Sequence, residues 1–280
     1  MMKHPMTFLR SLLCALLCAA LVFAAGCSNG DTDAPDAENA GSEAAEALPP
    51  EPPGEGVGRI KPVVVPPRPE RVCIDPGHGF LDSGAGDPAG GGKFSEGIYE
   101  KDIAMATSLL LDEELRARGF QTILTHDGVT MPEGADANGN GIFSAPYERP
   151  YYINDYIDPD LLVSVHVNSA EREGACGARI YWWQTSVKAN DWSETVSKSI
   201  AGAIDANVET TAETLIKNPG NEVGAEYVIL GETRCAATLV ELGFCTNETD
   251  ARNMEDPAWQ RSMARAIAIG IENFFDGTES

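Results

Sequence analysis

The sequence predicts an α/β fold: a single domain with a largely parallel mixed sheet, flanked by helices on both faces. From residue 71 onward, short apolar runs alternate with longer segments in which apolar residues recur at helical spacing. Two of the short runs, at 160–167 and 237–244, are apolar almost throughout, which is typical of strands buried on both faces.

The expected strands are short and rich in β-branched and aromatic residues. They are 71–74, 120–125, 160–167, 178–183 and 237–244. The expected helices show the 3.6-residue period, and the first has a stop signal at Gly119. They are 101–119, 192–208 and 258–275. Alternation of this kind places the strands side by side and mostly parallel.

The first 26 residues are predicted to be a signal peptide of the lipoprotein type. Lys3 and Arg10 precede an apolar run of about sixteen residues, which is too short for a comfortable transmembrane helix. The run ends in "FAAGC", so we expect cleavage before Cys27 and lipidation of that cysteine. Ordinary secretion and a retained anchor are the alternatives. The mature protein is expected in the cell envelope, anchored to the membrane by its lipid and facing the cell wall or periplasm.

Residues 27–70 are predicted to be a disordered tether. They are rich in acidic residues and proline and poor in large apolar side chains, so they cannot bury enough surface to fold. A proline-rich recognition motif is the alternative. Residues 71–280 then form the folded domain. The whole chain has 20 basic and 43 acidic residues, a net charge of −23. Such a charge repels phosphate backbones and argues against nucleic acid as a partner.

Four cysteines remain in the folded part. They are Cys73, Cys176, Cys235 and Cys245. Export permits disulfides, but the sequence leaves the pairing open. There is no C-x-x-C spacing, so a zinc site built from cysteines is disfavoured.

Polar residues stand at or near the ends of the predicted strands. His78 lies in the turn "DPGHG", His166 lies within "LLVSVHVNS", and Glu241 interrupts the apolar run "TLVELGF". Glu100 directly precedes the first helix. In α/β sheets, sites form at the carboxyl ends of strands, and two histidines with a carboxylate form a common open zinc set. The other interpretation is that these are unrelated buried residues, each hydrogen-bonded locally.

Four blocks together resemble a known family. They are "CIDPGHGFLDSGA", "EKDIAMATSLLLDEELRARGFQTILTHD", "ERPYYINDYIDPDLLVSVHVNS" and "TLVELGFCTNETDARNM". In this order they resemble the zinc-dependent N-acetylmuramoyl-L-alanine amidases of the amidase 3 type. The resemblance covers the whole folded part.

The resemblance implies one Zn²⁺ held by His78, Glu100 and His166, with Glu241 as the catalytic glutamate. Glu96 is the alternative to Glu100. The implied reaction is hydrolysis of the amide between N-acetylmuramic acid and L-alanine in peptidoglycan. A zinc peptidase acting on stem peptides and a non-catalytic wall-binding lipoprotein are the alternatives. An activator protein is not specified by the sequence.

Some features depart from the family pattern. His126 stands where the family more often has arginine, and we expect it to be exposed at a strand end. The segment "DANGNGIFS" resembles a calcium loop, with Asp136, Asn138 and Asn140 at alternating positions. Tyr147 replaces the closing glutamate, so a plain loop is the alternative to Ca²⁺ binding. Residues 181–183, Tyr-Trp-Trp, could line a substrate groove or pack in the core, and residues 207–227 could border that groove.

Overall fold

The computed structural model describes residues 65–80, 82–85, 99–130, 148–172, 174–183, 192–218 and 227–278. All of them belong to one compact unit, Lys61–Ser280. Cys27, Glu96 and the calcium-loop residues Asp136, Asn138 and Asn140 lie outside the described residues. Within the described part of the chain, no helix has the length and apolar character needed to cross a membrane.

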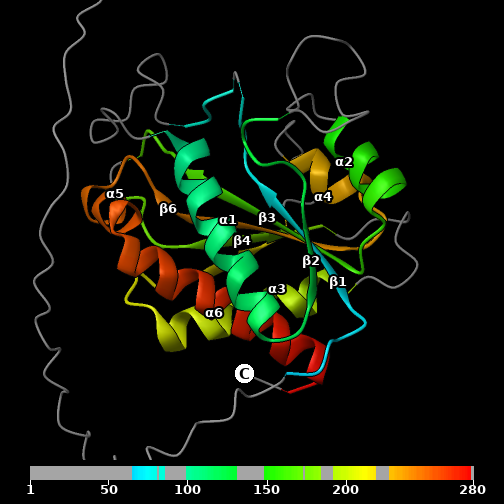
Figure 1. Cartoon of the computed structure of the whole chain (residues 1–280). Helices are drawn as coiled ribbons and strands as arrows, with labels where there is room; N and C mark the ends of the chain where they lie inside the picture. The colour runs from blue at the N-terminus through cyan, green and yellow to red at the C-terminus, as the bar shows by residue number, and fades with distance from the viewer. Residues whose placement is uncertain are drawn as a thin grey trace, which may run out of the picture. The chain divides into compact units, whose positions relative to one another are not determined.

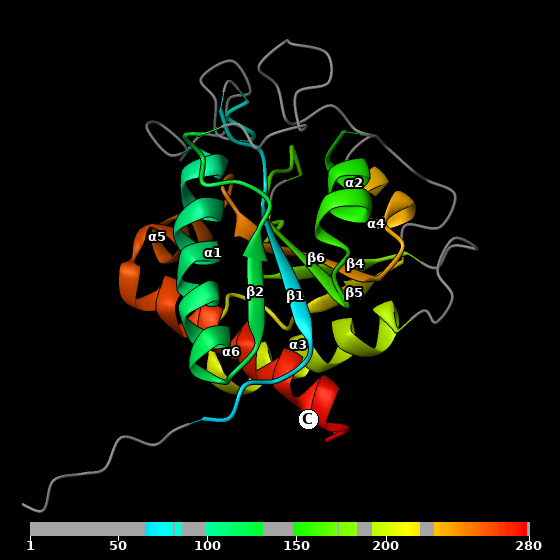
Figure 2. The ribbon, with the colours of Figure 1, turned by 45° about the vertical axis from the view of Figure 1, so that its right-hand side comes forward.

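A six-stranded sheet forms the centre of the domain (Figures 1 and 2). The strands are β1 (Arg71–Pro76), β2 (Gln121–Leu124), β3 (Leu161–Asn168), β4 (Arg179–Trp182), β5 (Leu215–Lys217) and β6 (Ala236–Phe244). Their order across the sheet is β2-β1-β3-β6-β4-β5, and all neighbours are parallel except β4 and β6, which are antiparallel. The largely parallel mixed sheet predicted from the sequence is therefore confirmed.

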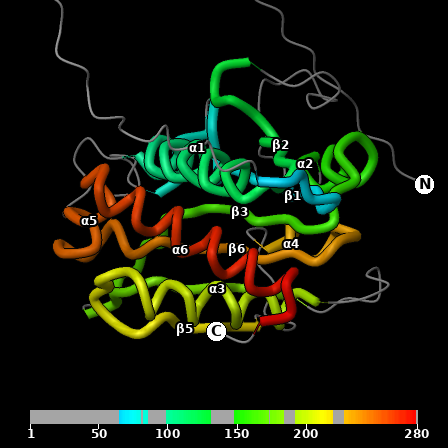
Figure 3. The backbone as a smooth tube through the Cα atoms, turned by 60° about the horizontal axis from the view of Figure 1, so that its bottom comes forward, coloured from blue at the N-terminus to red at the C-terminus, as the bar shows by residue number. Residues whose placement is uncertain are grey.

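Helices cover both faces of this sheet, as expected. They are α1 (Glu100–Ala117), α2 (Glu148–Tyr152), the π-helical turn η1 (Ile153–Ile157), α3 (Ser193–Asn207), α4 (Val228–Glu232), α5 (Glu248–Glu255) and α6 (Pro257–Asp276). The long helices α1, α3 and α6 pack on one face over the larger apolar core, and α6 contacts both of the others (Figure 3). The short segments α2, η1 and α4 cover part of the other face.

Local signals explain both ends of α6 and the end of α1. Asp256 caps α6 by accepting a hydrogen bond from the Ala258 amide at 2.9 Å, and Pro257 occupies the first turn. Gly277 ends the same helix with a φ of 65°. Gly119 follows α1 with a φ of 89°, which confirms it as the stop signal expected from the sequence.

A β-bulge in β6 shapes the sheet at the carboxyl ends of β3 and β6. His166 pairs with Glu241, but Asn168 pairs with Phe244, so β6 advances by three residues while β3 advances by two. Because paired residues point to the same face of a sheet, the bulge places Glu241 and Phe244 on one face. That face is the one on which the candidate site lies.

Candidate metal centre and catalytic cavity

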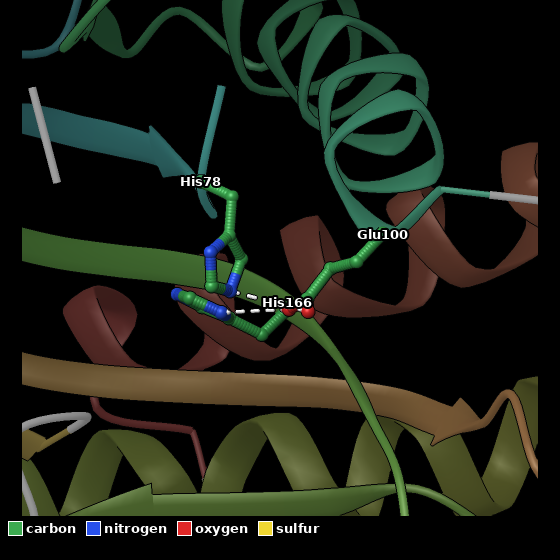
Figure 4. Close-up of side chains that lie close together, drawn as sticks. All are labelled: His78, Glu100 and His166. Carbon is green, nitrogen blue, oxygen red and sulfur yellow. Dashed lines mark hydrogen bonds and ion pairs between the residues drawn. The ribbon is translucent and has the colours of Figure 1, made fainter. Parts of the chain in front are cut away.

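Two histidines and one glutamate meet at the carboxyl ends of β1 and β3. His78 lies in the turn after β1, Glu100 is the first residue of α1, and His166 lies on β3 (Figure 4). Their potential ligand atoms all lie within 4.8 Å of one another. Across the described ranges this is the one cluster of His, Cys, Asp and Glu side chains with such spacing. The structure thus brings together the three residues that the sequence predicted as ligands.

Glu100 is the centre of this cluster. One carboxylate oxygen lies 2.9 Å from His166 Nδ1 and the other lies 3.1 Å from His78 Nε2. The amides of Ala85 and Val167 also donate to these oxygens, at 2.6 and 2.9 Å. The side chain is only 4% exposed. Its charge is favoured by these donors and by its place in the first turn of α1, where the helix dipole attracts negative charge.

The turn that carries His78 is unusual in its backbone. His78 and Phe80 have backbone φ values of 58° and 54°, which residues other than glycine rarely adopt. Gly79 and Asp82 exchange backbone hydrogen bonds and close the turn, at 3.0 and 2.9 Å. The Asp82 carboxylate then accepts from His78 Nδ1 at 2.8 Å. This bond favours the proton on Nδ1 and leaves Nε2, which faces Glu100, as the atom that can bind a metal.

Two glycines leave the space that the cluster occupies. A Cβ atom at Gly77 would lie 2.6 Å from His166 Nδ1. A Cβ atom at Gly84 would lie 2.5 Å from Glu100 Oε2 and 2.6 Å from His78 Cδ2, and Gly84 also has a positive φ of 69°. Both positions therefore need glycine for the three ligands to approach one another.

A buried ion pair between Asp75 and Arg149 supports the turn that carries His78. Asp75 is fully buried and accepts from the hydroxyls of Thr125 and Ser164, at 2.7 Å each. Arg149, on α2, donates to Asp75 at 3.2 Å, to the Pro76 carbonyl at 2.9 Å and to the His78 carbonyl at 2.6 Å. Burial opposes ionisation of Asp75, but the Arg149 charge and these hydroxyls lower its pKa below the usual value. Sequence reasoning missed both residues, because nothing local distinguishes them.

The expectation that His126 is exposed is wrong. Its side chain is 4% exposed, and its ring lies against the turn after β1. Nε2 donates to the Pro76 carbonyl at 2.9 Å, while Nδ1 accepts from the Gly128 amide at 3.1 Å. Burial and the nearby Arg149 charge lower the pKa of His126, so the ring is held neutral. It supports the turn through hydrogen bonds rather than through charge.

Glu241 faces the same cavity as the ligand cluster. It pairs directly with His166 across β3 and β6. The cavity has a volume of about 430 Å³ and contains all four predicted site residues together with Arg149. Its apolar wall is formed by Pro150, Tyr227, Ile229 and Leu239. The cavity therefore places a carboxylate beside a potential metal centre, with room for a substrate.

The electrostatics of the cluster favour a bound cation. Burial lowers the pKa of His78, but its hydrogen bonds to Asp82 and Glu100 outweigh this and raise the pKa to about 10. The ligand set itself, two imidazoles and one carboxylate, suits Zn²⁺ and leaves a coordination position open for water. Cys245 is no rival nucleophile: burial and the nearby Glu100 charge raise its pKa to about 11, so it remains a thiol at neutral pH.

The remaining sequence predictions have mixed outcomes. Cys73, Cys176, Cys235 and Cys245 are all free thiols. Tyr181 is buried in the core, while Trp182 and Trp183 are half-buried. Tyr227, at the end of the segment expected to border a groove, lines the cavity. Asp82 was missed, although an acidic residue four positions after a turn histidine is a signal that could have found it.

Comparison with known proteins identifies the family and the enzyme class of this chain. Residues 72–273 match the family model Amidase_3, described as N-acetylmuramoyl-L-alanine amidase. The chain belongs to this family, and its enzyme class is that of the N-acetylmuramoyl-L-alanine amidases. A germination-specific N-acetylmuramoyl-L-alanine amidase of Bacillus subtilis (strain 168) is 26% identical over 217 residues, 77% of this chain and 84% of the relative. The probable cell wall amidase LytH of Staphylococcus aureus is 25% identical over 206 residues, 73% of this chain and 58% of the relative.

Solved structures agree on the fold. The CwlD amidase from Clostridioides difficile, in complex with the GerS lipoprotein, has a TM-score of 0.58 and 23% identity, covering 74% of this chain and 99% of that one. The N-acetylmuramoyl-L-alanine amidase AmiC2 of Nostoc punctiforme has a TM-score of 0.57 and 25% identity, covering 74% and 97%.

Proposed function

We propose that the protein is a zinc-dependent amidase that hydrolyses the bond between N-acetylmuramic acid and L-alanine in peptidoglycan. One observation carries the proposal: His78, Glu100 and His166 converge at the edge of a cavity that Glu241 also lines. The family match and the wall amidases among the relatives support the substrate class.

His78, Glu100 and His166 would hold the metal. Bound there, Zn²⁺ would lower the pKa of water toward about 7 and polarise the scissile carbonyl. The protein contributes the orientation of the ligands. Asp82 sets the proton position on His78, and the backbone amides of Ala85 and Val167 hold Glu100. This support holds His78 and Glu100 in their orientations.

Glu241 would act as the general base and then as the general acid. It would take a proton from the attacking water and return it to the nitrogen of the leaving L-alanine. Its pairing with His166 places it next to the ligand cluster, on the same face of the sheet. The apolar wall formed by Pro150, Tyr227, Ile229 and Leu239 would exclude water from the other side of the substrate.

The test separates metal binding from proton transfer. Glu241→Gln should retain about one zinc per chain but lose about 10²- to 10⁴-fold of the activity on purified cell wall, because an amide cannot accept the proton. His166→Ala should lose the zinc as well as the activity. An active Glu241→Gln enzyme would exclude Glu241 as the base, and full zinc content in His166→Ala would remove His166 from the site.

Product analysis separates the amidase from a peptidase that acts on stem peptides. An amidase releases intact peptides with L-alanine at the amino terminus, whereas a peptidase shortens them. A wall-binding protein without activity would release neither product.

We also propose that the enzyme is exported and held at the membrane by lipid on Cys27, with residues 27–70 as the tether. The motif "FAAGC" and the acidic, proline-rich composition of the tether support this arrangement. The relatives described as cell wall amidases support a place in the cell envelope.

A further inference from the structure

One arginine continues the row of site residues across the sheet. Arg179 is the first residue of β4 and pairs with Glu241 in the antiparallel register between β4 and β6. Glu241 in turn pairs with His166 on β3. Because paired residues point to the same face, His166, Glu241 and Arg179 form a row over three neighbouring strands. Arg179 therefore stands beside the proposed catalytic glutamate, on the side away from the ligand cluster.

The Arg179 guanidinium has an unusual environment. Its carbon Cζ lies 4.4 Å from the centre of the Phe244 ring, which the bulge in β6 brings to this face. Its Nε is buried and has no hydrogen-bond partner, and among the described residues no carboxylate forms an ion pair with Arg179. An arginine carries five N–H donors, and leaving such donors unsatisfied is costly. The stacking on Phe244 fixes the group without using those donors.

A guanidinium held against an aromatic ring, without an ion-pair partner among the described residues, suits a carboxylate from the substrate. Planar guanidinium and carboxylate groups bind each other through paired hydrogen bonds. Arg179 lies one strand beyond Glu241, a spacing of about 4.8 Å, and an extended chain rises about 3.3–3.6 Å per residue. A group bound by Arg179 would thus lie one or two residues from the scissile amide.

The chemistry of the substrate indicates the side of that amide. The single carboxyl group of muramic acid is used up in the scissile bond itself. A free carboxylate nearby must therefore come from the stem peptide, whose second residue is an acidic one linked to L-alanine. We propose that Arg179 binds the carboxylate of this second residue and makes the enzyme selective for stem peptides in which it is not amidated. This inference rests on the proposed amidase function.

The experiment compares two soluble substrates that differ at one group. They are N-acetylmuramoyl-L-alanyl-D-glutamate with its γ-carboxylate blocked as a methylamide, and the same compound with the α-carboxylate also converted to a carboxamide. The parent enzyme should cleave the carboxylate form with a kcat/KM about 10- to 100-fold higher, the range expected for one charged hydrogen-bonded contact. Arg179→Gln should bring the two values together by losing activity on the carboxylate form alone. Arg179→Lys, which keeps the charge but not the paired donors, should retain part of the preference.

The matched control is Arg265→Gln. Arg265 is exposed on α6, which packs on the opposite face of the sheet, so this variant removes one positive charge away from the site. It should keep the full preference of the parent. Loss of the preference in this control would show that net charge, not Arg179, sets the selectivity.

The outcomes separate this inference from the proposed function. If the parent cleaves both compounds equally, or if Arg179→Gln slows both by the same factor, Arg179 is not a carboxylate-binding residue, whereas the amidase function stands. If the parent releases L-alanyl peptides from neither compound nor from cell wall, the amidase function fails and the inference falls with it.

Discussion

Replacing Arg149 by methionine should strongly destabilise the domain. Arg149 is 6% exposed and donates to Asp75, Pro76 and His78, while Asp75 is fully buried. Methionine fills similar space but leaves the Asp75 charge without its cation. Breaking a buried pair in this way costs about 3–5 kcal/mol. In a domain of about 200 residues this corresponds to a fall in Tm of roughly 6–20 °C.

The assay is urea unfolding followed by tryptophan fluorescence, at neutral and at acidic pH. The pKa of Asp75 is lowered in the folded protein, so its contribution to stability is present above the unfolded-state pKa of about 3.9 and is lost as pH falls. The difference between parent and Arg149→Met should therefore be largest at neutral pH and shrink in acid. The double variant Asp75→Asn/Arg149→Met should recover much of the loss, because no unpaired charge remains.

The control is Arg261→Met, which removes a surface pair with Glu113 at 3.3 Å. Exposed pairs contribute about 0–1 kcal/mol, so this variant should unfold close to the parent. A loss below about 1 kcal/mol in Arg149→Met, or one that does not depend on pH, would refute the view that the Arg149–Asp75 pair supports the turn.

Three further predictions concern the ligand cluster and the anchor. Asp82→Ala should weaken zinc binding about 10- to 100-fold in competition with a chelator, because His78 loses the partner that orients it; unchanged affinity would exclude this role. Gly84→Ala should abolish zinc binding while circular dichroism retains the helices, because the added methyl group would collide with Glu100 and His78; a zinc-replete variant would contradict the geometry. Cys27→Ser should release the protein into the soluble fraction or leave it unprocessed, with zinc binding intact, and fractionation identical to the parent would exclude lipidation.

The amino-acid sequence contains much of the fold and of the site. The apolar runs of β3 and β6 are long enough to identify as buried strands without knowledge of their neighbours. His166 and Glu241 interrupt those runs, and a polar group inside a buried strand requires a partner, a ligand or a function. Residues of this kind can be found locally, because the pattern around them is apolar and regular.

Other elements could not be found in this way. The short segments α2, η1, α4 and β5 have three to five residues each, too few for a period to be recognised. The antiparallel direction of β4 also has no local signal, because strand direction depends on the path of the connection before it. That direction nevertheless decides that Arg179, rather than Trp182, pairs with Glu241.

The sequence by itself thus determined the alternating strands and helices and the residue types that gather at the carboxyl ends of the strands. Only the tertiary structure decided how those residues are held. Arg149 and Asp75 are 74 residues apart in the chain, and His126 reaches Pro76 across 50 residues. These contacts are hydrogen bonds between groups that meet only when β1, β2 and α2 have packed. Their physical effect depends on burial, which a local pattern of residues cannot specify.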